Sequence, residues 1–454
     1  MRLPEAVEYV IVHIMQSGGQ AYLVGGALRD RMLGRTASDY DIATSFPPEK
    51  IEEIFQKEKT YLAGKRFGTV TVAAGGLSME ITTFRKESGY SDNRHPDEVA
   101  FVSDLESDLS RRDFTINAMA YNPFVDTGLI DPFHGKDDLR KRIIRTVGVP
   151  RERFQEDPLR MLRGIRFAAQ LDFELEEETR KAISECRAWL RRVSRERLRE
   201  ELVRLLLSPR PDKGLLLLQE TGILPILLYV GNDAETATDR EADRDRDKDK
   251  EMVTETDMDK ETAAAILSGK EAQIIKNVPE DQDTRLAALL TLLWPSAREK
   301  QLKNMLWNLR LDKKAIAHTL DLIKGYSRFC SMNITPYSMR KLLGAMNIPD
   351  MKRILHWYNT VWNAYENKDM EKKHSEAIRL LHAIWKKKDP VFPSDLAVNG
   401  TDIQSAGIGT DNGRLVGEAL HLAYEWVLKD PEKNDRDFLI KELKKKYGIP
   451  EKEK

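Results

Sequence analysis

The sequence predicts an α+β protein, in which a head of mixed sheet and helices over residues 1–150 precedes an all-helical remainder. Two observations lead to this fold class. Short β-rich runs and Gly-Gly turns occur before Pro150, whereas after it Leu, Arg and Glu recur with helical periodicity. The 454 residues suit about three domains, and a hydrophobic content of 41% excludes global disorder.

The elements of the head follow from local patterns. Amphipathic spacing predicts a first helix, and a short apolar run that stops at Gly25-Gly26 predicts the first strand. Two later β-rich runs are joined by Gly75-Gly76, a hairpin signal. In chain order we expect a helix at 4–16, a strand at 21–24, a helix at 27–33, and strands at 39–43, 69–74 and 77–84.

We expect the helical remainder to comprise a neck at 151–210, a body at 211–390 and a tail at 391–454. Tryptophans are expected as core anchors of this remainder. They are Trp294, Trp307, Trp357, Trp362 and Trp385.

Residues 233–261 form a low-complexity acidic segment with 13 acids and 6 bases. Its net charge is −7, so the rest of the chain carries +6 out of the formal total of −1. The segment has too little apolar surface to offset its ordering entropy, which predicts a disordered insertion. A weakly basic remainder suits a polyanionic partner.

Apolar runs, the N-terminal residues and the cysteines indicate the cellular location and exclude some classes of site. No apolar run approaches the roughly 18 residues of a membrane helix, so we expect no membrane partner. The first ten residues lack a signal-peptide core. Only Cys186 and Cys330 are present, which excludes a disulfide scaffold and a cysteine zinc site and favours a cytoplasmic location.

A phosphate site is indicated where the first strand ends. Two glycines let backbone approach an anion without a Cβ in the way, and the following helix offers free N–H groups. Gly26 and Arg29 are therefore candidate triphosphate contacts. The pattern is not a P-loop, because no Gly-Lys pair in the chain is followed by Ser or Thr.

Asp39 and Asp41 are candidate metal ligands on the next strand. Strand residues two apart point to one face, so their carboxylates repel unless a cation lies between them. Mg²⁺ prefers oxygen ligands and bridges phosphates. The alternative is a solvated edge strand with two surface acids, and the glycines and Arg29 upstream favour the metal site.

Three motifs together resemble one family. They are Gly25-Gly26-x-x-Arg29-Asp30 with Asp39-x-Asp41, the block Asp108-x-x-Arg111-Arg112-Asp113-Phe114-Thr115-Ile116-Asn117-Ala118, and Glu156-Asp157-x-x-Arg160-x-x-Arg163-x-x-Arg166-Phe167. They are similar to motifs of class II tRNA nucleotidyltransferases (CCA-adding enzymes) and bacterial poly(A) polymerases. The resemblance extends to about Arg210, fades in the body and returns weakly at 396–400.

The resemblance implies a polymerase-β-like nucleotidyltransferase head and roles for individual residues. Asp39 and Asp41 would be the catalytic metal carboxylates, and Glu80 is the candidate third acid or else a strand-edge residue. Arg112 would contact the nucleotide, and Asp113 would help to recognise the ribose hydroxyl.

The third motif implies base selection, for which Asp157 and Arg160 have suitable chemistry. A carboxylate accepts from the amino group of cytosine or adenine, and a guanidinium donates to the adjacent ring nitrogen; uracil and guanine present the opposite polarity. Arg163 and Arg166 continue at three-residue spacing toward the phosphates. The alternative is that Asp157, directly before Pro158, only caps a helix.

We therefore expect template-independent addition of CMP and AMP, from CTP and ATP with Mg²⁺, to the 3′ end of tRNA. Residues 85–96 resemble the family's flexible loop, associated with switching from C to A addition, which disfavours CC-only activity. The alternatives are an A-adding enzyme working with a separate CC-adding one, a bacterial poly(A) polymerase, and an inactive RNA-binding module.

Overall fold

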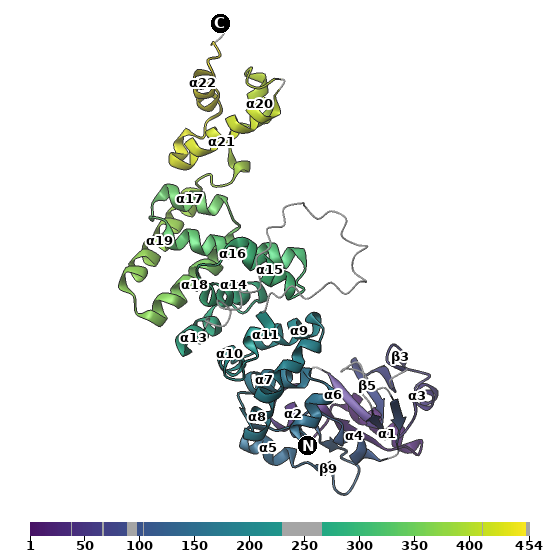
Figure 1. The fold of residues 1–454 in the computed structure, drawn as a ribbon. Coiled ribbons are helices and arrows are strands. Elements are labelled where there is room, and N and C mark those ends of the chain that lie inside the picture. Colours follow the sequence, from purple (N-terminus) through teal and green to yellow (C-terminus); the bar gives the residue numbers. More distant parts are fainter. Residues whose placement is uncertain are drawn as a thin grey trace. The chain divides into compact units, whose positions relative to one another are not determined.

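The computed structural model describes residues 1–37, 39–65, 68–88, 98–102, 104–228, 266–410 and 412–450. They divide into two units, the first comprising Met1–Ala272 and Asn304–Leu311, and the second Gln273–Lys303 and Asp312–Lys454. The expected fold class is confirmed, because a mixed sheet occurs in the first unit and helices make up nearly all the rest (Figure 1). The finer division into head, neck, body and tail stays a prediction. The acidic segment 233–261 lies outside the described residues.

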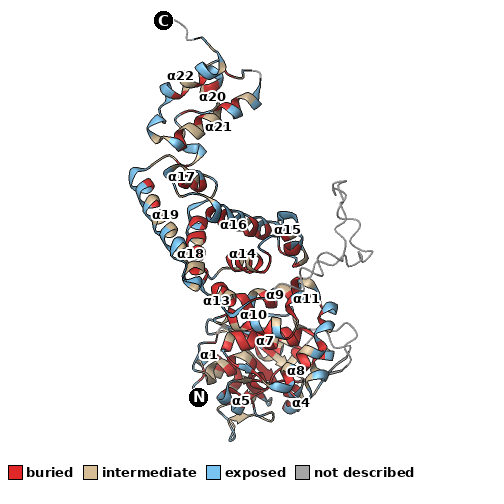
Figure 2. Ribbon diagram, turned by 60° about the vertical axis from the view of Figure 1, so that its left-hand side comes forward, coloured by how far each residue is buried: buried red, intermediate tan, exposed pale blue. Residues whose placement is uncertain are grey.

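A seven-stranded sheet forms the centre of the head. Only β2 and β5 pair in parallel, with Asp41 beside Glu80, and the remaining neighbours are antiparallel. Figure 2 shows the strands of this sheet largely buried. In spatial order the strands are β3 (Lys59–Tyr61), β4 (Thr69–Ala74), β5 (Leu77–Thr83), β2 (Tyr40–Thr44), β1 (Ala21–Val24), β8 (Ala120–Tyr121) and β9 (Leu129–Ile130).

Helices cover this sheet through apolar contacts. Helices α1 (Glu5–Gln16) and α3 (Pro48–Ile54) contact each other and the strands beneath them. Helix α4 (Leu105–Ser110) joins Tyr22, Val24 and Ala43 in one apolar cluster. Asp41 lies two residues before Ala43 on β2, so its side chain points toward the side of the sheet that α4 covers.

Several predicted boundaries in the head shift by one or two residues, and two of these shifts lie next to predicted site residues. Helix α2 (Gly25–Met32) begins two residues earlier than expected, directly where β1 ends. Strand β2 begins at Tyr40, so Asp39 precedes the strand instead of lying on it. The reason is the ladder itself, which reaches only to the pairs Val24–Asp41 and Met79–Tyr40.

The predicted hairpin is confirmed between β4 and β5. Gly75 and Gly76 have φ of 55° and 79°, the two positive values that a tight type I′ turn requires. Next along the chain, β6 (Arg85–Ser88) pairs with β7 (Glu98–Phe101). This pair begins within the loop predicted at 85–96, of which residues 89–96 lie outside the described residues.

The helical segment after the head is broken between two helices at Asp157-Pro158. Helix α6 (Pro150–Glu156) ends there, and α7 (Leu159–Leu171) begins with its first residues buried. Helix α7 packs against α9 (Arg195–Leu206) and α10 (Pro211–Glu220). The other α-helices and strands described in this part of the unit are α5 (Gly135–Lys141), β10 (Ile143–Ile144), β11 (Glu174–Leu175), α8 (Glu177–Cys186) and α11 (Leu224–Leu228).

The second unit is helical, and its core contains Trp357, stacked 3.8 Å from Tyr326. Trp294 is also buried, whereas the prediction is wrong for Trp307 and Trp385, which are 42% and 37% exposed. Within the described residues no helix combines the length and apolarity of a membrane span. The α-helices described here are α13 (Gly269–Asn277), α14 (Gln282–Leu293), α15 (Glu299–Asn308), α16 (Lys313–Ser331), α17 (Pro336–Gly344), α18 (Ile348–Tyr365), α19 (Lys368–Lys387), α20 (Gly400–Ser405), α21 (Gly413–Lys429) and α22 (Arg436–Tyr447), of which α13 and α15 also have residues in the first unit.

Candidate active site

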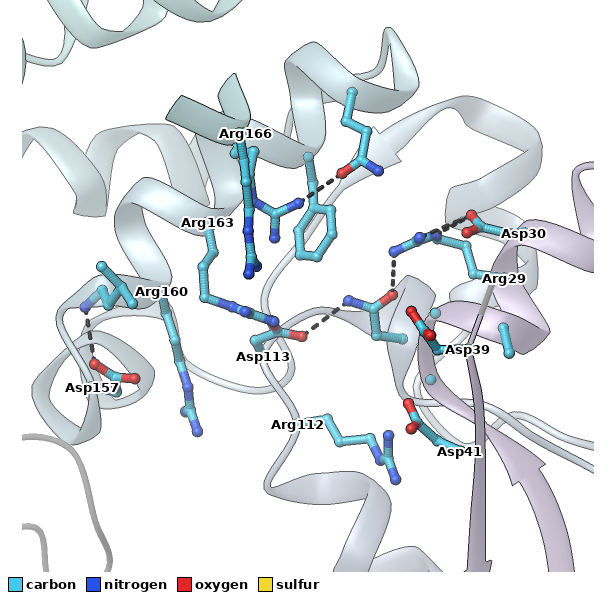
Figure 3. A pocket seen from close by; sticks show the side chains of 18 of the residues that line it. Arg29, Asp30, Asp39, Asp41, Arg112, Asp113, Asp157, Arg160, Arg163 and Arg166 are labelled. Carbon is cyan, nitrogen blue, oxygen red and sulfur yellow. Dashed lines mark hydrogen bonds and ion pairs between the residues drawn. The ribbon is translucent and has the colours of Figure 1, made fainter. Parts of the chain in front are cut away.

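One cavity of about 590 Å³ in the first unit brings the predicted site residues together. Figure 3 shows the acids of the β2 region on one side and the side chains of the neck on the other. Their roles stay predictions, but their convergence is observed. The predicted residues that line the cavity are Gly26, Arg29, Asp39, Asp41, Arg112, Asp113, Asp157, Arg160, Arg163 and Arg166.

The acidic side of the cavity has the donor chemistry of a divalent cation site. Burial raises the pKa of Asp41, and the negative charges of Glu80 and Asp39 raise it further, while Arg112 opposes them. A divalent cation would relieve this repulsion. Among the described residues no cluster of three acids, histidines or cysteines is arranged to hold a metal, so Asp39 and Asp41 would need phosphate or water oxygens to complete the coordination.

Glu80 lies beside Asp41 in the parallel β2–β5 ladder, and neighbouring partners in a ladder point to the same face. Its side chain is exposed and does not line the cavity. Its influence on Asp41 is therefore electrostatic, and its role as a third metal acid stays a prediction.

Gly25 allows the side chains of Asp41 and Arg112 to approach its backbone closely. Its φ is +69°, and a Cβ built there would lie 3.1 Å from Asp41 Oδ2 and 3.3 Å from Arg112 Nη1. Both the backbone conformation and the space therefore favour glycine. The glycine pair read from the sequence acts here through Gly25 as well as through Gly26, which also lines the cavity.

Asp108 anchors the two arginines of the second motif, a function that the sequence analysis did not assign. Its carboxylate is 2.8 Å from Arg111 Nη2 and 3.1 Å from Arg112 Nη2. Burial opposes ionisation, but these two guanidiniums lower the pKa of Asp108. Arg112 Nε is buried with no hydrogen-bond partner among the described residues. Asp108 thus fixes one edge of the Arg112 guanidinium, and the Nε–H of Arg112 remains to be satisfied by a hydrogen-bond acceptor.

Arg29 and Asp113 are joined through Asn117. Arg29 donates to Asp30 Oδ1 at 2.8 Å and to Asn117 Oδ1 at 2.9 Å, and Asn117 Nδ2 donates to Asp113 Oδ1 at 3.1 Å. The side chain of Arg29 is buried at the cavity wall. Asn117 belongs to the second motif, yet its position in this chain of contacts depends on tertiary packing.

Asp113 is already fully engaged by protein donors. Arg163 donates to its Oδ2 from Nε at 2.9 Å and from Nη2 at 2.6 Å, and the Phe114 backbone N–H donates to Oδ1. Burial opposes ionisation, but Arg163 and the hydrogen bonds lower the pKa of Asp113 to about 2. Recognition of a ribose hydroxyl by Asp113 would therefore require this carboxylate to share its acceptors.

Asp157 and Arg160 both line the cavity but are paired with other groups instead of with each other. Asp157 Oδ2 is 2.8 Å from Arg197 Nη2, and its Oδ1 accepts from the Leu159 backbone N–H at 3.1 Å. Arg160 is 2.6 Å from Glu156 and donates to the Arg111 carbonyl at 3.0 Å. Asp157 therefore makes the helix-capping contact that was the alternative expectation for it, and its second carboxylate oxygen, Oδ2, pairs with Arg197.

Arg197 and Arg204, which lie outside the three motifs, also line the cavity. Residues seven apart share one face of a helix, so both project from the same side of α9. Glu201 on this face is 2.5 Å from Arg166 Nε and 4.0 Å from Arg163 Nη1. The only signal in the sequence for this surface is the helical spacing of Arg197, Glu201 and Arg204.

Comparisons with known proteins agree with this geometry. Residues 21–145 match the family described as the poly A polymerase head domain, and residues 172–231 match a probable RNA and SrmB-binding site of polymerase A. A CCA-adding enzyme of Lactobacillus johnsonii is 49% identical over 214 residues, which cover 47% of this chain and 53% of that protein. One from Geobacillus sp. is 47% identical over 231 residues, covering 50% and 56%.

Solved structures extend the similarity beyond these segments. The crystal structure of a Bacillus stearothermophilus CCA-adding enzyme in complex with CTP is 28% identical, with a TM-score of 0.74, and covers 99% of this chain and 100% of that one. A Thermotoga maritima CCA-adding enzyme complexed with tRNA shares the fold at 21% identity and a TM-score of 0.64, covering 97% and 94%.

In sequence, the chain matches only about half the length of its curated relatives. The family match at residues 21–145 includes the cavity-lining residues of the first two motifs. Nucleotidyltransferases of this family generally use a divalent metal ion. Residues 21–145 thus match the poly A polymerase head domain, and the similarity of the chain to the CCA-adding enzymes is confirmed.

Proposed function

We propose that the chain adds CMP and AMP from CTP and ATP to the 3′ end of tRNA, building or repairing the CCA terminus without a nucleic-acid template. The observation that carries this proposal is the single cavity, which is bordered by Asp39 and Asp41 at one side and by Asp157 and Arg160 at the other. Groups for phosphoryl transfer and groups for base selection thus surround one space.

In the proposed reaction the tRNA 3′-hydroxyl oxygen attacks the α-phosphorus of the bound nucleotide. The bond from that phosphorus to the β-phosphate bridging oxygen breaks, the hydroxyl proton is lost, and pyrophosphate leaves. Arg29 and Arg112 would bind the triphosphate. Mg²⁺ held by Asp39 and Asp41 would supply activation of the hydroxyl and neutralisation of the leaving group.

Base selection would require Asp157 and Arg160 to exchange their present partners. The edge of cytosine or adenine offers an amino donor and a ring acceptor, which match a carboxylate and a guanidinium. Arg197 and Glu156 hold these two groups in the structure and would release them, wholly or in part, to the base. Uracil and guanine would leave buried donors and acceptors unpaired, which costs about 1–3 kcal/mol each.

The tRNA is the proposed partner, and the net charge of +6 outside residues 233–261 suits its phosphates. We also expect the helical part of the protein to recognise A-form RNA through its shape and backbone, since the proposed reaction uses no nucleic-acid template. A cytoplasmic location is part of this proposal, and it rests on two free cysteines in a chain without a disulfide among its described residues.

Three tRNA transcripts test the proposal, ending before CCA, after C and after CC, each incubated with labelled CTP or ATP separately. Incorporation of C into the first two and of a single A into the third would support CCA addition. Incorporation of A alone would identify an A-adding enzyme. Long A tracts on unrelated RNA would identify a poly(A) polymerase and contradict the proposal.

The Asp39→Ala variant separates catalysis from binding. We expect tRNA binding, measured by gel shift, to persist while incorporation falls by at least about a thousand-fold, since a metal carboxylate is lost. Glu49→Ala, an exposed acid on α3, serves as the matched control and should incorporate normally. Undiminished incorporation by Asp39→Ala would contradict the metal site.

A further inference from the structure

Three arginine side chains surround the ring of Phe167 at the wall of the cavity. The guanidinium carbon of Arg166 lies 4.0 Å from the ring centroid, that of Arg29 lies at 5.1 Å and that of Arg163 at 5.5 Å. All are within the distance at which an aromatic face attracts a cation. Arg29 comes from the head and the other two from the neck, so the ring joins both parts of the site.

The ring of Phe167 is held in place from behind. It is only 6% exposed, and Phe114 meets it edge-on, with centroids 5.7 Å apart and planes at 83°. Phe114 in turn packs on the backbone of α7, because a Cβ built at Gly164 would lie 3.0 Å from Phe114 Cζ. The aromatic platform therefore has little freedom to follow the arginines if they move.

The hydrogen bonds of the three guanidiniums run to other groups. Arg29 is bound by Asp30 and Asn117, Arg163 by Asp113, and Arg166 by Glu201 and Gln170. These contacts use the N–H edges, whereas an aromatic ring attracts the cation through its π face. Three like charges gathered at one place repel each other, and the negative ring face offsets part of that repulsion.

We propose that Phe167 is a positioning residue for nucleotide binding, whose π face fixes Arg29, Arg163 and Arg166 as ligands of the triphosphate. This inference rests on the proposed function, in which Arg29 meets the triphosphate, and it adds Arg163 and Arg166, which line the same cavity. Because the phosphates are common to all nucleotides, Phe167 should set affinity without setting the choice of base. Arg160, which is proposed to contact the base, is held by Glu156 and the Arg111 carbonyl.

The test replaces Phe167 in the full chain with mono-, di- and trifluorophenylalanine by nonsense suppression. Fluorine withdraws electron density from the ring face with little change in shape. The dissociation constants of CTP and ATP, measured by calorimetry, should rise stepwise to about ten-fold for the trifluorinated ring. Phe167→Tyr should bind like the wild type, and Phe167→Leu should bind at least as weakly as the trifluorinated protein.

Fluorination of Phe154, a fully buried ring on α6, is the matched control. A stepwise loss at 167 with a flat series at 154, and unchanged discrimination against UTP and GTP, would support the inference. No trend at 167, or equal losses at both positions, would overturn it while leaving the wild-type reaction intact. A wild-type chain that binds neither CTP nor ATP would remove the proposed function and this inference together.

Discussion

Asp157 of the helix break in the neck and Arg197 of α9 form an ion pair of 2.8 Å at the wall of the cavity. The two residues are 40 positions apart in sequence, and both side chains are largely buried. The pair fixes the orientation of the carboxylate that is proposed to select the base. Arg197 on α9 thus orients Asp157, which belongs to the third motif.

The first prediction follows from this pair. Arg197→Gln should lower kcat/KM for CTP and ATP by about ten-fold, the factor that corresponds to about 1.4 kcal/mol, because the carboxylate of Asp157 loses its orientation. Discrimination against UTP should fall as well. Arg204→Gln on the same face of α9, where the side chain is 62% exposed, is the control. Equal effects of both substitutions would show that only the charge of the cavity matters.

The second prediction separates backbone strain from crowding. Gly25 and Gly34 have similar φ, +69° and +71°, but only at Gly25 would a Cβ meet Asp41 and Arg112. Alanine at either position should cost about 1–2 kcal/mol of unfolding free energy, measured by urea titration. Nucleotide incorporation should fall by more than about ten-fold only in Gly25→Ala, since two site residues must shift. Normal activity of that variant would contradict the close approach.

The third prediction concerns acid stability. The pKa of Asp113 is lowered to about 2, so the stability from its contacts is present above the unfolded pKa near 3.8 and is lost as the pH falls toward 2. Unfolding free energy of the wild type should drop by about 2 kcal/mol more than that of Asp113→Asn between pH 5 and pH 2. Parallel curves for the two proteins would show that Asp113 titrates normally.

The fourth prediction concerns the second unit, where His318 of α16 links α14 and α18. Its ring nitrogens lie 2.7 Å from Asp283 and 3.0 Å from Asp350, with Arg353 beside Asp350 and Asp281. Burial opposes protonation, but hydrogen bonds to the two carboxylates raise the pKa of His318. The contribution is therefore complete below pH 6.5 and is lost as the pH rises through the folded pKa.

His318→Gln should consequently flatten the decline of the melting temperature between pH 6 and pH 9. His421→Gln, at an exposed position on α21, is the control and should keep the wild-type dependence. A variant of His318 with the wild-type slope would contradict the double carboxylate contact. The measurement uses the full chain, and the transition that involves the second unit is followed by tryptophan fluorescence.

Local chemistry explains why much of the head was predictable. The bounds of β1 and the turn at Gly75-Gly76 depend on residues adjacent in sequence, and both are confirmed. Strand β2 begins one residue later than predicted, because its start is set by the ladder with the neighbouring strands and not by the alternation of acids in the sequence. The three motifs converge as expected because each ends or begins an element at the same cavity.

The partners of the motif residues could not be predicted in the same way. Arg197 holds Asp157, and Phe167 lies among three arginines, only after distant elements have packed. The Asp108–Arg112 pair is instead a local contact between residues four apart. Trp307 and Trp385 failed as core anchors for a related reason, since burial depends on which helix face meets a neighbour. Residue type alone does not specify that face.

All eight arginines that line the cavity have a carboxylate within 4.0 Å: Arg29, Arg111, Arg112, Arg160, Arg163, Arg166, Arg197 and Arg204. These arginines share six carboxylates, those of Asp30, Asp108, Asp113, Glu156, Asp157 and Glu201, so an arriving triphosphate meets guanidiniums whose charge the protein already balances in large part. It displaces internal acids more than it releases dissolved counterions. Raising the ionic strength should accordingly weaken binding of the nucleotide only slightly. Binding of the proposed tRNA partner, a much longer polyanion that would contact exposed basic side chains, should weaken more.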